Sequence, residues 1–187
     1  MSIFKTGIIV GRFQHIHKGH EKLINIGLEL SDKLLIFIGS ANESNTIRNP
    51  FDYELRKKLI TKIYSDEIKS GKIIIQGVND ITNPSDLTPL WGKHLLNEAS
   101  IYLGKKPELL IYGKDKDVNK CFLQEDMENI TEVYVDRKSL KVSGTHLREC
   151  ILNGEFENWK ECVNNKLYDE YDKISEIIFN VYKGEGK

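Results

Sequence analysis

Cysteine, proline and long apolar runs are all scarce in this chain of 187 residues. It contains three cysteines and four prolines. The cysteine count is odd and no two cysteines form a CxxC pair, which argues against a disulfide framework or a zinc site. No apolar run approaches the roughly 20 residues that span a bilayer, and the N-terminal apolar stretch is too short for a signal peptide. We therefore expect a cytoplasmic protein with reduced thiols.

An excess of charge of one sign is also absent. Lys and Arg total 27 against 28 Asp and Glu, a formal net charge of −1. No field over the whole surface attracts nucleic acid or an acidic membrane, so any anion site has to be local. The chain also lacks a basic and aromatic stripe, which disfavours a nucleic-acid binder. The 40% hydrophobic and 29% charged residues are typical of a globular protein, and we expect a single domain over residues 1–187.

Short aliphatic runs alternate with longer amphipathic patterns along the chain. The aliphatic runs cover residues 6–12, 33–38, 72–76, 109–112 and 131–135. The helical patterns cover residues 19–31, 52–70, 87–104 and, with a weaker pattern, 117–126. Continuous aliphatic runs suit strands that are buried on both faces, and their alternation with helices predicts βαβ units. The fold class is therefore α/β, a doubly wound parallel sheet with C-terminal helices.

The pattern changes after residue 143. Ser143-Gly144-Thr145 precedes apolar residues at helical spacing, which predicts a capped helix. The segment NGEFENW, residues 153–159, then interrupts that helix. Residues 166–183 have the pattern of one amphipathic helix that packs on the body of the domain, whose core we place at about residues 6–165.

The stretch GRFQHIHKGH, residues 11–20, places two histidines and a lysine where a predicted strand meets a helix. Ligands of open parallel sheets bind at the carboxyl ends of the strands. The helix start offers free N–H groups and a partial positive charge, and His17, Lys18 and His20 add side-chain donors. Neither GxxxxGK[ST] nor GxGxxG is present, so the loop is neither a Walker loop nor a dinucleotide fingerprint. Together these features predict a polyphosphate site.

GRFQ followed by HxGH resembles the nucleotidylyltransferase superfamily that carries the HxGH motif. The second signature of that superfamily, a helix start ending in a basic residue, corresponds to SGTHLR at residues 143–148. GRFQ, together with GSANESNTIRNPF at residues 39–51, is similar to the archaeal-type nicotinamide-mononucleotide adenylyltransferases. The resemblance implies a Rossmann-like fold. It also implies a role in NAD biosynthesis or salvage, in which ATP and nicotinamide mononucleotide (NMN) give NAD and pyrophosphate.

The resemblance also implies which residues meet the nucleotide. The catalytic residues would be His17, His20 and Arg148. The residues that bind ATP and its phosphates would be Gly11, Arg12, Phe13, Gln14, Lys18, Arg48, Gly113, Ser143, Gly144 and Thr145. Two assignments have structural alternatives: Arg48 as a surface arginine, and Arg56, where relatives also carry an arginine, as a residue that supports the fold.

The implied acceptor pocket departs from the family pattern. Its residues would be Val10, Gly39, Ser40, Ala41, Asp80, Ile81, Asn83 and Trp91. Relatives carry D-I-x-x-N-x-x-W here, and their tryptophan stacks on nicotinamide. In this chain the segment between Asp80 and Trp91 is longer. Asn83 either matches the family asparagine or that asparagine is missing, and Trp91 is alternatively a core residue at a helix start.

The implied chemistry needs few special groups. The 5′-phosphate of NMN is already an anion and requires no general base, so catalysis is mostly positioning and charge neutralisation. Mg²⁺ would arrive bound to ATP with few or no protein ligands, and Asp115 and Asp117 fit a solvated loop better than a metal site. Two alternatives stay open: the same fold acting on nicotinate mononucleotide or phosphopantetheine, and a nucleotide-sensing module without turnover. Relatives form oligomers, so we also expect a homo-oligomer.

Overall fold

The computed structural model describes residues 2–81, 88–113, 121–136 and 142–184. Within these ranges the strands are β1 (Phe4–Gly11), β2 (Ser31–Ile38), β3 (Ile73–Gly77), β4 (Leu109–Gly113) and β5 (Thr131–Val135). They form one sheet in the order β3-β2-β1-β4-β5, and each neighbouring pair is parallel. The predicted doubly wound parallel sheet is confirmed.

The strands all end at one edge of the sheet. Gly11 of β1 pairs with Ile38 of β2, and Ile38 pairs with Gly77 of β3, so these carboxyl ends lie side by side. The chain then crosses over and places β4 on the other side of β1. The reversal between β1 and β4 is the position at which open α/β sheets bind their ligands.

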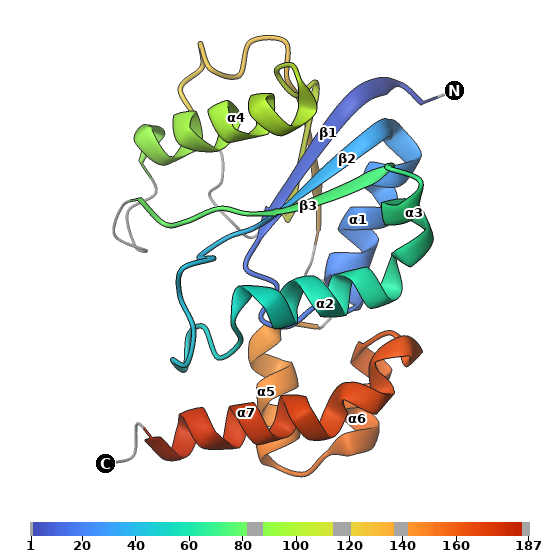
Figure 1. Ribbon diagram of the computed structural model, residues 1–187, viewed down its shortest axis with the longest axis vertical. Coiled ribbons are helices and arrows are strands. Elements are labelled where there is room, and N and C mark those ends of the chain that lie inside the picture. Colours follow the sequence, from blue (N-terminus) through green and yellow to red (C-terminus); the bar gives the residue numbers. More distant parts are fainter. Residues whose placement is uncertain (1, 82–87, 114–120, 137–141, 185–187) are drawn as a thin grey trace.

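Helices cover both faces of the sheet (Figure 1). On one face lie α1 (Lys18–Leu30), α2 (Tyr53–Ile63) and α3 (Ser65–Lys69), and on the other lies α4 (Pro89–Leu103). Strand residues alternate between the two cores: Ile9 and Ile36 pack under α1 and α2, whereas Ile8 and Leu35 pack under α4. Burial on both faces explains why the strand sequences are continuously aliphatic. None of the described helices combines the length and the apolar character that crossing a bilayer requires.

A further group of helices lies below α2 in the view of Figure 1. It consists of α5 (Gly144–Leu152), α6 (Phe156–Cys162), the 3₁₀ helix η3 (Asn165–Glu170) and α7 (Tyr171–Gly184). Trp159 and Ile174 join the core cluster that also contains the α1 and α2 residues. Lys58 and Lys62 of α2 hold the buried carboxylate of Glu170 at 2.7 and 3.0 Å. The C-terminal helices are thus joined to the rest of the chain by both apolar and charged contacts.

Three expected elements differ from the prediction. The pattern over residues 52–70 splits into α2 and α3 at Tyr64, whose ring is buried and whose hydroxyl donates to Asn25 Oδ1 at 3.1 Å. The segment 166–183 begins as a 3₁₀ helix before it continues as α7. The interruption after α5 is only three residues long, 153–155, because Gly154 ends that helix with a left-handed φ of 72° and α6 follows directly.

The predicted helix over residues 117–126 is wrong where the structure describes it. Residues 117–120 lie outside the described ranges, and residues 121–126 form no α-helix, with turns at residues 124–126. The Cys121 carbonyl packs so closely on α4 that a Cβ added at Gly92 would lie 1.8 Å from its oxygen. The next residue, Phe122, is buried as well. The close packing of this segment against α4 therefore outweighs its weak helical pattern.

Candidate active site

A cavity of about 180 Å³ lies at the carboxyl edge of the sheet. Its lining comes from three segments that are far apart in the sequence: the loop after β1 with the start of α1, the loop after β2, and the start of α5. The lining residues are Arg12, Phe13, Gln14, His17, His20, Arg48, Ser143, Gly144, Thr145 and Arg148. Each of them is a residue that the sequence assigned to ATP or to catalysis. The structure thus brings the HxGH and SGTxxR motifs to one cavity.

The two histidines of the HxGH motif lie against each other at the start of α1. His17 caps the helix, and its Nδ1 accepts a hydrogen bond from Gly19 N at 3.1 Å, which leaves the ring proton on Nε2. The His17 and His20 rings stack with their centroids 3.9 Å apart, and Phe13 backs His20 at 4.7 Å. Both imidazoles are nearly buried, with 1% and 9% of their surface exposed. Packing therefore orients them in advance, as donors to a transition state require.

Three arginines surround the histidines. Arg12 Nη1 donates to the Arg48 carbonyl at 3.3 Å. Burial, and then the charges of Arg48 and Arg148, lower the pKa of Arg12. The described part of the lining contains these cations and no carboxylate, and cations that repel one another are stabilised by a bound anion. The cavity therefore suits a polyanion such as a triphosphate.

Arg148 connects the two motifs. Its Nη1 donates to the Gln14 carbonyl at 3.1 Å, and its Nη2 donates to Thr145 Oγ1 at 3.2 Å. Within the described chain its buried Nε has no hydrogen-bond partner, so that donor is available to a ligand. Ser143 caps α5 by accepting from His146 N at 3.1 Å. Because the first residues of α5 line the cavity, the N–H groups of this helix start add to the anion site.

Replacing Gly144 with alanine is expected to reduce both stability and activity. The added Cβ would lie 2.8 Å from the Gln14 carbonyl oxygen and 3.3 Å from Arg148 Nη1, so α5 must move away from the β1 loop. Overpacking of this kind lowers the free energy of unfolding by about 1–3 kcal/mol. The accompanying shift of Arg148 should lower kcat about tenfold.

Urea unfolding and steady-state kinetics measure the two effects of Gly144→Ala. Gly184→Ala is the matched control, because a Cβ at Gly184 meets nothing within 4 Å. An unchanged kcat in Gly144→Ala would mean that the contact between α5 and the β1 loop does not set the catalytic geometry.

Gln14 fixes the β1 loop to the loop that follows β2. Its Nε2 donates to the Phe51 carbonyl at 3.1 Å, and its Oε1 accepts from Phe51 N at 2.9 Å. The buried Asn49 side chain accepts from Gln14 Nε2 and from Arg12 Nη1, each at 3.5 Å. These contacts fix the two loops that carry Arg12 and Arg48 relative to each other. The sequence placed Gln14 at the site but did not identify Asn49, although the NPF motif that contains it was the available signal.

Arg56 lies beneath the site and supports the fold, which is the structural role that the sequence left open. Its side chain is completely buried. Nη1 donates to the carbonyls of Arg12 and Gly39 at 3.0 and 2.8 Å. Nη2 donates to the Ser40 carbonyl at 3.0 Å, and Nε donates to the Asp52 carbonyl at 3.0 Å. One guanidinium therefore ties the ends of β1 and β2 together. Burial is the main reason why the pKa of Arg56 falls to about 10, so the group remains charged at neutral pH.

The remaining residues predicted to bind ATP lie near the cavity without lining it. Gly11 ends β1, and its carbonyl accepts from Gly39 N at 2.9 Å. Gly113 ends β4 at the same edge. Lys18 is exposed on the first turn of α1. Its charge acts on the Cys162 thiol of α6, so the ammonium group lies toward the C-terminal helices.

Four of the predicted acceptor residues follow β2 and β3 directly. Gly39, Ser40 and Ala41 come after β2, and Ser40 adopts a left-handed φ of 49°. Asp80 comes after β3, and its negative charge partly opposes the burial that lowers the pKa values of Arg12 and Arg56. These residues therefore share the edge of the sheet that carries the cavity.

The other predicted acceptor residues are more dispersed. Val10 and Trp91 are partly buried against the core cluster under α4, with Trp91 in the first turn of that helix. Ile81 is 46% exposed. Asn83 lies outside the described residues, as does the segment 114–120 with its two aspartates. Stacking of Trp91 on nicotinamide stays a prediction.

The three cysteines are buried and free. Burial is the main cause of the raised pKa of each thiol, which is the opposite of what a nucleophilic cysteine needs. In the ranges that the structure describes, no group of three or more His, Cys, Asp or Glu side chains is placed to hold a metal ion.

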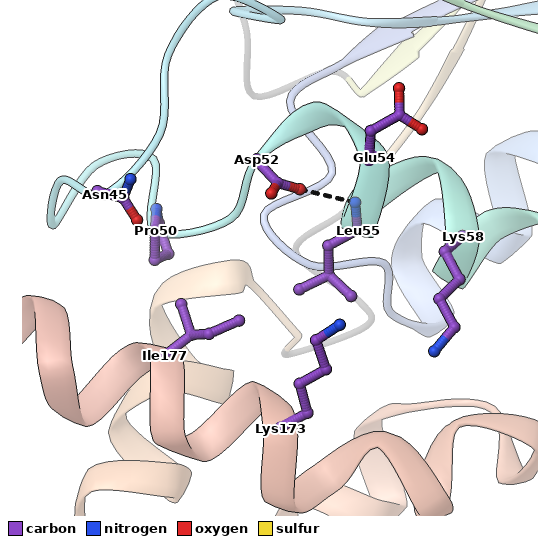
Figure 2. Close-up of a pocket in the computed structure, with 8 residues that line it drawn as sticks. All are labelled: Asn45, Pro50, Asp52, Glu54, Leu55, Lys58, Lys173 and Ile177. Carbon is purple, nitrogen blue, oxygen red and sulfur yellow. Dashed lines mark hydrogen bonds between the residues drawn. The ribbon is translucent and has the colours of Figure 1, made fainter.

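A second cavity, of about 370 Å³, lies between the loop after β2, α2 and α7 (Figure 2). Its lining residues are Asn45, Pro50, Asp52, Glu54, Leu55, Lys58, Lys173 and Ile177. Asp52 accepts from Leu55 N at 2.8 Å and so caps α2, as the dashed line shows. Lys58 pairs with Glu170. No residue predicted for the site lines this cavity, and these polar groups already serve the fold, so we place the candidate site in the smaller cavity.

His15, next to Gln14, makes the stability of the protein depend on pH in the acid range. Its ring is fully buried. Burial, and to a lesser extent the charge of Arg148, lowers its pKa from 6.5 to about 4. Between these two values the unfolded chain binds the proton more readily, so stability is complete above pH 6.5 and falls as the pH drops toward 4. The expected loss of unfolding free energy from this one group between pH 7 and pH 5 is about 2 kcal/mol.

Urea unfolding of the unaltered chain and of His15→Gln at pH 7 and pH 5 measures this effect. The variant lacks the titrating ring and should lose less stability on acidification. Asp169 and Glu170, whose ion pairs lower their pKa values, titrate in both proteins and cancel in the comparison. Equal losses in the two proteins would contradict the assignment to His15.

The chain matches the Cytidylyltransferase-like family over residues 8–150. It is 30% identical over 176 residues to a nicotinamide-nucleotide adenylyltransferase of Thermoplasma acidophilum, a match that covers 92% of this chain and 90% of that protein. It is 28% identical over 172 residues to the protein of the same name from Picrophilus torridus, covering 90% of this chain and 93% of that one.

Solved structures share the fold at lower identity. A bifunctional NMN adenylyltransferase/ADP ribose pyrophosphatase from Francisella tularensis, complexed with AMP and a manganese ion, superimposes with a TM-score of 0.71 at 20% identity. The match covers 95% of this chain and 52% of that protein, so this chain spans about half of its length. The NadR protein in complex with NAD and AMP-PNP superimposes with a TM-score of 0.59 at 20% identity, over 89% of this chain and 46% of that one.

Proposed function

This chain belongs to the cytidylyltransferase-like family, and we propose that it transfers AMP from ATP to NMN, giving NAD and pyrophosphate. The observation that carries the proposal is the meeting of the HxGH histidines with Arg148 in one cationic cavity. The relatives from Thermoplasma acidophilum and Picrophilus torridus, both named nicotinamide-nucleotide adenylyltransferase, support NMN as the acceptor. The chain is a nucleotidyltransferase of NAD biosynthesis.

The reaction is an in-line displacement at phosphorus. An oxygen of the NMN 5′-phosphate attacks the α-phosphorus of ATP and forms the new O–P bond. The bond from the α-phosphorus to the oxygen that bridges to the β-phosphate breaks, and pyrophosphate leaves with that electron pair. The attacking phosphate is already ionised, so the protein has to position the groups and neutralise charge rather than remove a proton.

The side chains of the cavity fit these tasks. His20 donates to the α-phosphate oxygens, which gain charge in the transition state, and His17 donates to the rest of the triphosphate. Arg48 and Arg148 neutralise the departing pyrophosphate. The capped start of α5, with its hydroxyls and N–H groups, holds the terminal phosphates. Lys18, which lies near the cavity without lining it, contributes a further positive charge.

ATP enters as its Mg²⁺ complex. The Francisella tularensis protein is complexed with AMP and a manganese ion, which supports the use of a divalent cation. The charged side chains that line this cavity are arginines and histidines, so the oxygen ligands that Mg²⁺ prefers are those of the phosphates. The ion is therefore part of the substrate, and Arg12, Arg48 and Arg148 bind the oxygens that it leaves free.

The acceptor is the part of the proposal that most needs a direct test. A coupled pyrophosphate-release assay with ATP and Mg²⁺, with the product identified by mass, should compare NMN, nicotinate mononucleotide, phosphopantetheine and FMN. We expect turnover with NMN at least about tenfold above the other acceptors. Turnover with another acceptor would support the proposed phosphate site, but it would mean that the segment between Asp80 and Trp91 binds an acceptor other than NMN. Binding of ATP without pyrophosphate release from any mixture would contradict the proposal and indicate a sensing module.

We also propose that residues 1–187 form one nucleotidylyltransferase domain and that copies of the chain associate. The shared core cluster of the sheet and the C-terminal helices supports the first statement. Light scattering tests the second, and the mass of a single chain in solution would contradict it.

A further inference from the structure

A buried hydrogen bond joins the β1 loop to the C-terminal helices. Trp159 Nε1 donates to His15 Nε2 at 3.1 Å, across 144 residues of sequence. Neither side chain is exposed to solvent. Because both partners are buried, water cannot replace one of them when the other is removed. Trp159 belongs to α6, which lies beyond the residues 8–150 that match the family.

His15 uses both ring nitrogens to fix the loop. Its Nδ1 lies 2.8 Å from the Ile16 carbonyl and donates to it, so Nε2 is the acceptor for Trp159. The neighbouring residues belong to the cavity: the Gln14 carbonyl accepts from Arg148, and His17 lines the cavity wall. A displacement of His15 would therefore move Gln14, which contacts Arg148 of the SGTxxR motif, and His17 of the HxGH motif.

Trp159 is held rigidly on the other side of this bond. Phe156 stacks on its indole at 6.0 Å with the rings inclined by 15°, and Tyr171 meets it edge-on at 4.9 Å. Aromatic contacts of this kind orient both rings. The N–H that points at His15 thus comes from a fixed part of the C-terminal helices.

We propose that Trp159 is a positioning residue, which acts through His15 to hold His17 and the contact between Gln14 and Arg148 in catalytic geometry. The inference rests on the proposed adenylyl transfer and extends the machinery for it to α6. Neither Trp159 nor His15 lines the cavity, so the pair acts on the reacting groups only through the loop.

Single substitutions on each side of the bond test the proposal. Trp159→Phe removes the N–H, and His15→Leu removes the acceptor. We expect each to lower kcat about tenfold at a temperature well below its Tm. Because both substitutions break the same bond, the kcat of the double variant should be no lower than that of the less active single variant. His15→Gln, which offers an amide oxygen close to the position of Nε2, should recover most of the lost kcat.

Phe156→Leu is the matched control, because it disturbs the same aromatic cluster and leaves the bond intact. Its Tm should fall while its kcat stays within about twofold of the unaltered chain.

Hydrogen exchange supplies a readout that does not depend on the acceptor. The amides of residues 12–20 should exchange about tenfold faster in Trp159→Phe and His15→Leu than in the unaltered chain or in Phe156→Leu. The inference is overturned if either kcat or the exchange of this loop stays within about twofold of the unaltered chain in both variants. If the unaltered chain turns over no NMN, the proposed function fails, and the exchange comparison alone then decides the positioning role.

Discussion

Replacing His20 with alanine is expected to lower kcat for NAD formation about a hundredfold, while the KM for ATP changes less than about threefold. The imidazole is packed between Phe13 and His17, and in the proposed mechanism it donates to an oxygen whose charge grows in the transition state. A donor of this kind contributes little to ground-state binding, so its loss appears mainly in kcat. Steady-state kinetics of pyrophosphate release measure both constants.

The controls separate chemistry from folding. His17→Ala should also lower mainly kcat, because His17 lines the same cavity. His94→Ala removes an imidazole from α4, outside the cavity lining, and should leave kcat unchanged. The Tm of His20→Ala shows whether loss of the stacked ring has unfolded the loop. A loss in kcat of less than about threefold in His20→Ala or His17→Ala, with the fold intact, would exclude that histidine from the catalytic step.

Replacing Arg56 with methionine is expected to lower the free energy of unfolding by about 3 kcal/mol or more. The guanidinium donates to four backbone carbonyls, those of Arg12, Gly39, Ser40 and Asp52. Methionine fills a similar volume, so the loss comes from buried acceptors that are left without donors rather than from a cavity. Because the first three of these carbonyls lie at the carboxyl ends of β1 and β2, activity should fall as well. Urea unfolding followed by circular dichroism measures the stability.

Two further variants serve as comparisons for the stability of Arg56→Met. Arg56→Lys keeps the charge but presents a compact ammonium in place of the planar fork, so it should recover only part of the stability. Lys57→Met, one residue further along α2, removes a partly exposed cation that lies 5.5 Å from the Tyr53 ring and should change stability by less than about 0.5 kcal/mol. A loss below about 1 kcal/mol in Arg56→Met would mean that water satisfies the carbonyls when the guanidinium is absent.

Much of the fold could be predicted from the sequence because the relevant signals are local. A strand that is buried on both faces has to be continuously apolar. A helix start has free N–H groups and needs a capping side chain. Both features can therefore be recognised from a few consecutive residues. The predicted runs at residues 33–38 and 131–135 accordingly became β2 and β5. The position of the nucleotide site could be predicted for the same reason, since parallel strands bring the segments that follow them to one edge. Most of its individual residues were instead implied by the resemblance to a known family.

Features that depend on distant contacts could not be predicted. The helical pattern of residues 52–70 continues past Tyr64, and only the packing of the Tyr64 ring shows why the helix ends there. The pattern around residues 117–126 is weakly helical, and only the contact between Cys121 and Gly92 shows why residues 121–126 form no α-helix. In each case a tertiary contact outweighs a local preference of a few tenths of a kcal/mol per residue, about the size of a helix propensity.

By itself, the sequence determined the α/β class, the placement of the HxGH motif between a predicted strand and a helix, the placement of the SGTxxR motif at a predicted helix start, and the polyanionic character of the ligand. The tertiary structure alone decided that Arg56 supports the fold beneath the cavity, and that His15 meets Trp159. The physical reason is the range of the interactions. Periodicity and capping act within one or two turns of chain, whereas a buried hydrogen bond forms between whichever donor and acceptor the packed core brings together, here across 144 residues.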